Sequence, residues 1–186
     1  AAHAMIWLRE AAGPTISDCI VRDCYGQILS SGPNHLGDPV GHPRLLRCTF
    51  QNNDWIKLLI SFNYNEPYIE DCQFIGNSAL YIGYSYWFNN KPSYVNCLFE
   101  GNAVGEGGVI HARSGSAVDL TSCIFRDNMM QNSCILGSSN DGGGMGYFNL
   151  ADTEFCNNDP GQGICSDWND LGGNSFGDHC TCDADV

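Results

Sequence analysis

Basic residues are scarce in this sequence. Eight lysines and arginines stand against 21 aspartates and glutamates, so the formal net charge is −13 at pH 7. A chain with this charge repels phosphate backbones and anionic membranes through its long-range field. Nucleic acid is therefore not an expected partner, and few cations remain to grip an acidic polysaccharide.

Long apolar runs are also missing. No segment reaches the roughly 20 apolar residues that cross a bilayer, and the start at Ala1-Ala2-His3-Ala4 has no basic-then-apolar leader. We therefore expect no membrane span and interpret the chain as a mature or excised piece. The sequence has no Asn-x-Ser/Thr acceptor, so conventional N-glycosylation is not predicted. Threonine is rare and forms no Thr-x-Thr array, which disfavours ice binding.

Paired Cys-x-x-Cys motifs are absent although the chain has 11 cysteines. Without zinc-type spacing, so many cysteines favour an oxidising compartment, and we expect a secreted or cell-surface protein. Hydrophobic residues make up 43% of the chain, charged residues only 16%, and there are 22 glycines. This composition predicts one folded all-β domain with frequent tight turns.

The sequence repeats the template Cys-x-Phe-x-x-Asn. Four clear copies begin at Cys48, Cys72, Cys97 and Cys123, and looser copies lie around Cys19, Thr153 and Asn174, at intervals of 21 to 30 residues. A period of this length is typical of a solenoid in which each repeat forms one coil. We therefore predict a single right-handed parallel β-helix of about seven rungs over residues 1–186. Residues 1–13 are a candidate N-terminal cap, and residues 159–186 the Cys-rich final rungs and C-terminal cap.

Each position of the template has a physical interpretation. Cys and Phe are two residues apart, so they share one face of a strand and are predicted to point inward. The residue between them is predicted to point outward in each copy: Ile20, Thr49, Gln73, Leu98, Ile124 and Glu154. The closing Asn tolerates left-handed backbone angles, and stacked copies form an amide ladder. The predicted ladders contain Cys19, Cys48, Cys72, Cys97 and Cys123; Phe50, Phe74, Phe99, Phe125 and Phe155; and Asn53, Asn77, Asn102, Asn128 and Asn158.

Other positions around the template also recur. Pro14, Pro43, Pro67 and Pro92 precede the Cys position by five residues, as expected at the first residue of a strand. The residue three before the Cys position is apolar in every copy and is predicted to face the core: Ile16, Leu45, Ile69, Tyr94, Leu120, Leu150 and Leu171. A second strand is expected in most coils, at residues 28–29, 56–60, 80–84, 109–110, 134–136 and 164.

The Phe-x-x-Asn repeats at Phe50, Phe74, Phe99, Phe125 and Phe155, followed by Gly107-Gly108-Val109-Ile110, resemble the FxxN and GGA[ILV] repeats of polymorphic outer-membrane proteins. The resemblance covers nearly all the chain through short motifs. It implies a right-handed β-helix and a surface-exposed adhesin passenger. The chain lacks the amphipathic β-barrel segment of that family, so the resemblance implies no membrane anchor of that kind.

The stacked cysteines are interpreted as small buried hydrophobic residues rather than a metal or redox column. The remaining cysteines are candidate disulfide partners: Cys24, Cys134, Cys156, Cys165, Cys180 and Cys182. Cys156 with Cys165 is one pair that we consider. A metal could instead be held by Asp178, His179, Cys180 and Cys182, but a C-terminal cap crosslinked by disulfides is the simpler interpretation. No metal and no cofactor is predicted.

Two groups of residues carry weak signals for chemistry. Glu106, His111 and Arg113 lie on one coil and are the best candidates for polysaccharide catalysis, which needs paired carboxylates or a base beside arginines. The aromatic residues Tyr64, Tyr84, Tyr86 and Trp87 could form an outward patch for sugar stacking or protein contact. Both groups are equally well explained by polar turns and core packing.

The sequence therefore favours a non-enzymatic extracellular structural role over catalysis. We expect a subunit or segment of a surface fibre, coat or adhesin, assembling end to end through its unpaired strand edges. The alternative is a carbohydrate-binding or polysaccharide-active β-helix protein, such as a lyase, glycosidase or epimerase. The expected partners are copies of the chain, other extracellular proteins or glycans.

Overall fold

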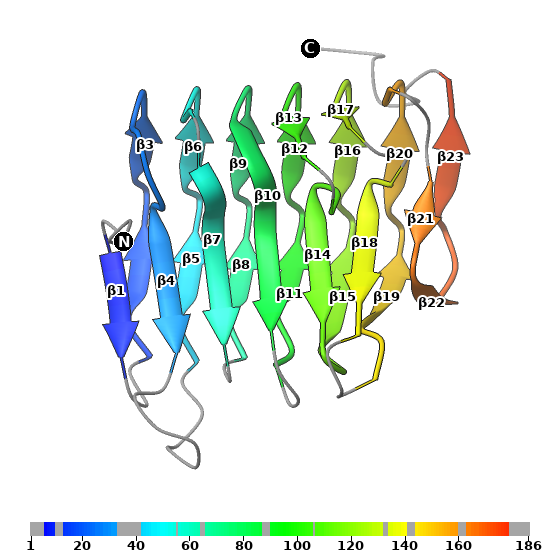
Figure 1. The fold of residues 1–186 in the computed structure, drawn as a ribbon, viewed down its shortest axis with the longest axis horizontal. Coiled ribbons are helices and arrows are strands. Elements are labelled where there is room, and N and C mark those ends of the chain that lie inside the picture. The colour runs from blue at the N-terminus through cyan, green and yellow to red at the C-terminus, as the bar shows by residue number, and fades with distance from the viewer. Residues whose placement is uncertain are drawn as a thin grey trace.

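A computed structural model describes residues 6–9, 13–32, 42–54, 56–63, 66–86, 90–105, 107–131, 134–140, 144–159 and 163–178. These residues form short strands that wind into stacked coils, and every pairing between named strands is parallel (Figure 1). Among the described residues, no helix is long and apolar enough to cross a membrane. The predicted all-β, right-handed parallel solenoid is confirmed.

Three parallel sheets run along the solenoid, and each coil contributes a strand to each of them in turn. The first sheet has the order β2 (Thr15–Ser17), β5 (Arg44–Leu46), β8 (Tyr68–Glu70), β11 (Ser93–Val95), β15 (Ala117–Thr121), β19 (Tyr147–Ala151) and β22 (Asp167–Asp170). The second has the order β3 (Ile20–Arg22), β6 (Thr49–Gln51), β9 (Gln73–Ile75), β12 (Leu98–Glu100), β16 (Ile124–Arg126), β20 (Glu154–Cys156) and β23 (Ser175–Gly177).

The third sheet contains the strands of most variable length. Its main order is β1 (Ile6–Arg9), β4 (Leu29–Gly32), β7 (Ile56–Asn63), β10 (Ser78–Tyr86), β14 (Ile110–Arg113), β18 (Leu136–Ser139) and β21 (Ile164–Cys165). Two shorter strands lie off this order: β13 (Ala103–Val104) pairs with β10, and β17 (Met129–Met130) pairs with β13. Part of the candidate N-terminal cap is thus β1, which extends the third sheet, whereas residues 1–5 and 10–12 of the cap lie outside the described residues.

The prolines stand immediately before the strands of the first sheet, as predicted. Each lacks an N–H but keeps its carbonyl, which accepts a hydrogen bond from the next coil. The Pro43 carbonyl accepts from the Tyr68 N–H at 2.9 Å, and the Pro67 carbonyl accepts from the Ser93 N–H at 2.9 Å. Proline therefore begins these strands without interrupting the stacking of coils.

The core is a set of columns in which like residues lie over like. Phe50, Phe74, Phe99, Phe125, Phe155 and Phe176 form a continuous stack with ring centroids 4.5 to 5.1 Å apart. Phe74, Phe99, Phe125 and Phe155 are fully buried. No coil could bury such rings alone, so stability comes from the contacts between neighbouring coils.

The asparagines form the predicted ladder at the corner between the second and third sheets. The Asn77 Oδ1 accepts from the Asn53 N–H at 3.1 Å and from the Asn53 Nδ2 at 2.9 Å. The same arrangement continues through Asn102, Asn128 and Asn158. The residue before each Asn has a positive φ, for example 52° at Asn52 and 62° at Gly76, so the chain turns sharply there.

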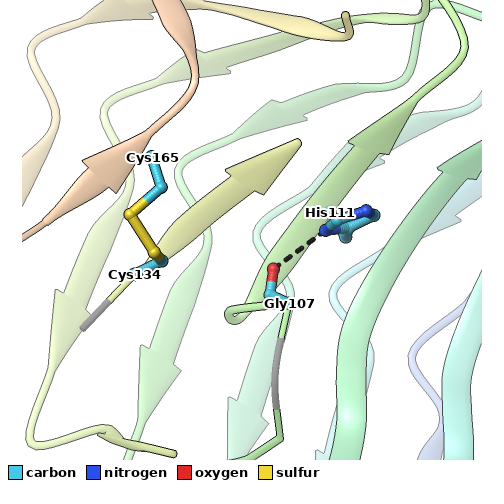
Figure 2. The surroundings of a disulfide bond; sticks show 4 residues. All are labelled: Gly107, His111, Cys134 and Cys165. Atoms are coloured by element: carbon cyan, nitrogen blue, oxygen red, sulfur yellow. Dashed lines mark hydrogen bonds between the residues drawn. A yellow bond between two sulfur atoms is a disulfide. The ribbon is translucent and has the colours of Figure 1, made fainter. Parts of the chain in front are cut away.

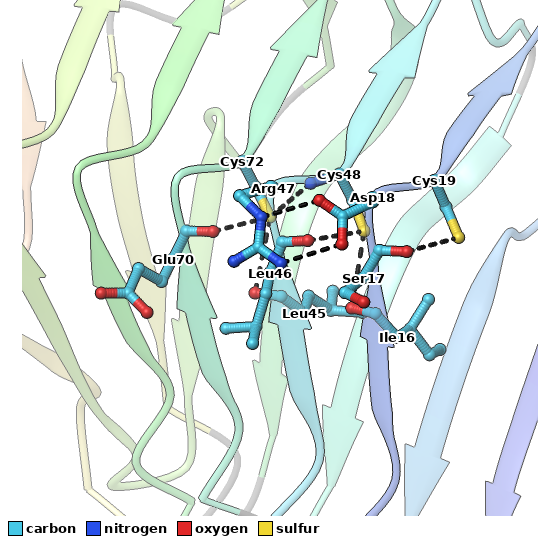
Figure 3. A network of polar contacts seen from close by, with 10 residues as sticks. All are labelled: Ile16, Ser17, Asp18, Cys19, Leu45, Leu46, Arg47, Cys48, Glu70 and Cys72. Atoms are coloured by element: carbon cyan, nitrogen blue, oxygen red, sulfur yellow. Dashed lines mark hydrogen bonds and ion pairs between the residues drawn. The ribbon is translucent and has the colours of Figure 1, made fainter.

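The cysteines occupy the other corner, between the first and second sheets (Figure 3). The Cys48 thiol contacts the Leu46 carbonyl at 3.4 Å, and the Cys48 N–H donates to the Cys72 Sγ at 3.4 Å. Cys48, Cys72, Cys97 and Cys123 are buried, but Cys19 is exposed because it lies in the first coil of this column. The Cys19 thiol contacts the Ser17 carbonyl at 3.0 Å, as the Cys48 thiol contacts that of Leu46, so Cys19 keeps its place in the column and differs in exposure.

An ion pair covers this Cys corner on the outside. The Arg47 guanidinium donates to both carboxylate oxygens of Asp18, at 2.7 and 2.8 Å (Figure 3). The hydrogen bond from Arg47 lowers the pKa of the Asp18 carboxyl below its ordinary value. Both side chains are exposed, so the pair contributes little to stability.

The last described coil departs from the predicted columns. The register pairs Leu150 with Asp170, and Phe148 with Trp168, so the predicted inward position of Leu171 is shifted by one residue. Leu171 is instead 66% exposed. Glu154, predicted to face outward, is only 7% exposed. Asn174 replaces Cys in its column, and its Oδ1 accepts from the Thr153 N–H at 2.9 Å.

Candidate functional site

One disulfide of the described residues joins Cys134 to Cys165 on neighbouring coils (Figure 2). This bond excludes the considered pair of Cys156 with Cys165, although Cys156 is itself disulfide-bonded. Cys24 is a free thiol, so its prediction as a disulfide partner is wrong. It occupies the Asn position of the first coil, where its N–H donates to the Asn53 Oδ1 at 3.1 Å. Cys180 and Cys182 lie outside the described residues.

The third sheet places His111 beside Tyr84. The register pairs these two residues across β10 and β14, where they alternate with the core residues Gly83, Ile110 and Ala112 and so lie on the outer face. Their rings are nearly parallel, with an interplanar angle of 5° and centroids 5.8 Å apart. Tyr81 adds a third ring, 4.8 Å from His111 and 5.2 Å from Tyr84.

Arg113 extends the same group. Its Nη1 donates to the Tyr84 hydroxyl at 2.8 Å, and its guanidinium lies 5.0 Å from the centroid of the Tyr86 ring. Hydrogen bonding to Tyr84 raises the pKa of Arg113. The Tyr84 and Tyr86 rings are 6.0 Å apart and inclined by 25°. We call this set the aromatic face: Tyr81, Tyr84, Tyr86, His111 and Arg113.

His111 is held rigidly within the aromatic face. Its Nδ1 is 3.1 Å from the Gly107 carbonyl, and its Nε2 is 2.9 Å from the Ser139 hydroxyl (Figure 2 shows the first contact). The side chain is 7% exposed, and this burial lowers the pKa of His111 below its ordinary value. Both ring nitrogens therefore contact groups of the chain, and these contacts fix the orientation of the His111 ring.

Glycines allow the chain to pack this closely around His111. A Cβ on Gly107 would lie 2.8 Å from the His111 Nδ1, and one on Gly137 would lie 2.4 Å from the Gly107 carbonyl oxygen. Gly137 pairs with His111 on one side and Cys165 on the other. The Cys134–Cys165 disulfide therefore fixes the strand against which the histidine rests.

The structure unites two predictions that the sequence kept apart. The catalytic candidates His111 and Arg113 and the patch residues Tyr84 and Tyr86 belong to one cluster, whereas Glu106, Tyr64 and Trp87 lie outside the described residues. A bulge in β10, where the N–H groups of Ile82 and Gly83 both contact the Val109 carbonyl at 3.0 Å, shifts Tyr84 into line with His111. The contribution of Ser139 had no signal in the sequence.

Burial favours the neutral thiol at Cys48, Cys72 and Cys97 of the cysteine column. Burial raises the pKa of the Cys72 thiol to about 12, so the nucleophilic thiolate is scarce at neutral pH. Among the described residues, no group of three or more His, Cys, Asp or Glu side chains could hold a metal ion. His179, the remaining metal candidate, lies with Cys180 and Cys182 outside them.

Comparison with known proteins identifies a family but no individual relative. No curated protein and no solved structure matches the chain. A family model described as right handed beta helix region matches residues 2–159, which is most of the sequence. The parallel coils, the stacked phenylalanines and the asparagine ladder agree with this match. The chain therefore belongs to the right-handed β-helix family.

Proposed function

We propose that this chain is a non-catalytic, extracellular carbohydrate-binding module of the adhesin type, and that its aromatic face contacts the glycan. The observation that carries the proposal is the arrangement of Tyr84 and Tyr86, whose partly exposed rings lie nearly parallel on the outer surface of β10. Tyrosine combines an apolar ring face with a polar hydroxyl, which suits a sugar ring with C–H and O–H groups.

Arg113 prepares this surface for binding. Its hydrogen bond to Tyr84 and its position over Tyr86 hold both rings before any ligand arrives. Side chains that are already ordered lose less conformational entropy on association, so a preorganised surface binds more tightly than a mobile one. The guanidinium also offers hydrogen-bond donors to sugar hydroxyl or carboxylate groups.

Two features support an extracellular, adhesin-like role. The Cys134–Cys165 disulfide is of the kind that persists in oxidising compartments. The Phe-x-x-Asn repeats are similar to those of surface-exposed adhesin passengers.

End-to-end assembly is supported less well than a separate module. In the last described coil, Asp170 occupies the column that holds Leu45, Ile69, Tyr94, Leu120 and Leu150 in earlier coils. Its Oδ1 accepts from the Gly172 N–H at 2.9 Å and the Asn174 Nδ2 at 2.7 Å. A charged, hydrogen-bonded network at the end of an apolar column is typical of a capping repeat. Stacking another coil there would bury the carboxylate.

A glycan array with the intact chain tests the proposal. We expect Tyr84→Ala and Tyr86→Ala to weaken binding of the best glycan about fivefold or more, through loss of aromatic contact area. Tyr25→Ala is the matched control, because Tyr25 is an exposed tyrosine of the first coil, 72% exposed. Binding to no glycan, or equal losses in all three variants, contradicts the proposal. Release of new reducing ends during incubation would contradict its non-catalytic part.

A further inference from the structure

The outer face of the first sheet contains a shallow groove that is separate from the aromatic face. It lies over β8, β11, β15 and β19 and has a volume of about 460 Å³. Six of its lining residues matter here, and we call the set the first-sheet groove: Tyr68, Ser93, Val95, Asp119, Thr121 and Asn149. This volume is in the range of pockets that hold small organic ligands.

The register explains the shape of the groove. Tyr68, Ser93, Asp119 and Asn149 occupy one row across four neighbouring strands. Ser93 is the smallest of them, so the surface is lowest between the Tyr68 ring and the Asp119 carboxylate. The Arg44 guanidinium lies 5.4 Å from the Tyr68 ring centroid and supports that ring from the preceding coil.

Successive side-chain hydrogen bonds orient the polar groups along the row that contains Asp119 and Asn149. The Asn169 Nδ2 donates to the Asn149 Oδ1 at 2.8 Å, and the Asn149 Nδ2 donates to the Asp119 Oδ1 at 2.6 Å. These hydrogen bonds fix the Asp119 carboxylate, which lines the groove, and its second oxygen makes no hydrogen bond to any described residue. The half-buried Ser93 and Thr121 hydroxyls likewise make no hydrogen bond within the described part of the chain.

The charge of the groove selects the class of ligand. Asp119 lies in the groove, and Glu70 stands next to Val95 in the neighbouring row, so the groove repels carboxylated or sulfated sugars. The remaining recognition elements are one aromatic ring, a fixed carboxylate and hydroxyl groups. Uncharged sugars match this set, because their C–H faces stack on aromatic rings and their hydroxyls donate to a carboxylate.

We propose that the first-sheet groove binds an uncharged oligosaccharide that runs across the coils. One sugar ring contacts Tyr68, and the hydroxyls of the next donate to Asp119 and exchange hydrogen bonds with Ser93 and Thr121. Neighbouring coils are about 4.8 Å apart, a spacing close to the length of one pyranose unit. Successive sugars therefore meet successive coils. This site does not depend on the aromatic face.

The test is an NMR titration of the ¹⁵N-labelled chain with cellohexaose, xylohexaose, mannohexaose and laminarihexaose. We expect at least one of them to shift the amide signals of Ser93, Asp119 and Thr121. Tyr68→Ala should weaken that binding about fivefold or more, and Asp119→Asn should weaken it several-fold, because the variant loses one acceptor charge. Both side chains are on the outer face, and an unchanged melting temperature verifies the fold.

The outcomes separate this proposal from the one above. Binding that survives Tyr86→Ala but falls with Tyr68→Ala supports the first-sheet groove. Oligosaccharide binding that falls only with Tyr86→Ala overturns the groove and leaves the aromatic face as the binding site. The groove proposal is also overturned if none of the four oligosaccharides shifts the amide signals of Ser93, Asp119 and Thr121. It is likewise overturned if a lysine-rich hexapeptide shifts these signals and no oligosaccharide does, because the groove would then bind a basic peptide.

Discussion

The side-chain amide of Asn102 donates to the Asn128 Oδ1 at 2.9 Å, while its own Oδ1 accepts from the Asn77 N–H at 3.0 Å. The Asn102 Nδ2 also donates to the Phe74 carbonyl at 2.8 Å. One buried amide therefore satisfies two backbone groups of the preceding coil and also bonds to the Asn128 side chain of the next coil. This relationship makes the ladder a continuous chain of hydrogen bonds along the solenoid rather than a series of separate turns.

Replacing Asn102 should be strongly destabilising. Asn102→Ala leaves the Phe74 carbonyl and the Asn77 N–H buried without this partner, and each unsatisfied group costs about 1–3 kcal/mol. We expect the free energy of unfolding to fall by about 2–5 kcal/mol, measured by urea denaturation. Gln131→Ala, at an exposed amide of the same region, should change it by less than about 0.5 kcal/mol. Similar values for both variants would show that the ladder is not a source of stability.

Removing the Cys134–Cys165 disulfide should also destabilise the fold. The bond closes a loop with a sequence separation of 31 residues, for which chain entropy predicts a stabilisation of about 3–4 kcal/mol. We expect the Cys134→Ser/Cys165→Ser double variant to unfold at a lower urea concentration than the oxidised wild type. Reductant should shift the wild type further than the double variant. If reductant shifts the two equally, the effect belongs to another disulfide.

The thiols should react according to their depth in the cysteine column. At pH 8, iodoacetamide should modify the exposed Cys19 rapidly. Cys72 and Cys97 should stay unmodified in the folded chain, since burial raises the pKa of both thiols and excludes the reagent. Peptide mapping by mass spectrometry measures each position, and labelling in urea provides the control for intrinsic reactivity. Labelling of Cys72 at the rate of Cys19 in the folded chain would contradict a packed column.

Acid should weaken the fold through His111. Burial lowers the pKa of His111 in the folded chain, whereas in the unfolded chain it titrates near 6.5. The unfolded state therefore takes up a proton first as the pH falls, so the contribution of His111 to stability is complete above about pH 6.5 and declines below it. Denaturation curves between pH 7.5 and 5 should show a smaller pH dependence for His111→Gln than for wild type. Equal dependence in both proteins would assign the acid effect to other groups.

The regular part of the fold was predictable because its physical demands repeat. Every coil needs a residue that tolerates a turn at each corner, and it needs Phe and Asn at the same positions of the template. The inward orientation of Phe74 and the ladder position of Asn77 could therefore be predicted from sequence spacing alone. Prolines gave the starts of the first-sheet strands for the same reason. These positions depend on contacts between equivalent residues, which a repeat displays directly.

The aromatic face and the last coil were harder to predict because they break the repeat. The bulge at Ile82 and Gly83 alters the spacing that aligns Tyr84 with His111. In the last coil, Asn174 replaces Cys and Asp170 replaces an apolar residue, so the template misplaced Leu171 by one position. The disulfide joins strands of the third sheet, where loop lengths vary most, and spacing could not choose Cys134 as the partner of Cys165.

Asp170 also bears on how many coils share the apolar column of the first sheet. A stack of equivalent parallel coils has no internal limit on its length, because every coil presents to the next coil the same surface on which it is itself stacked. In the last described coil, the Asp170 carboxylate takes the place of the apolar side chain that follows Leu150 in this column, and the equivalence ends there. Duplicating a coil upstream of Asp170 should therefore yield a longer apolar column that is followed by the same polar coil.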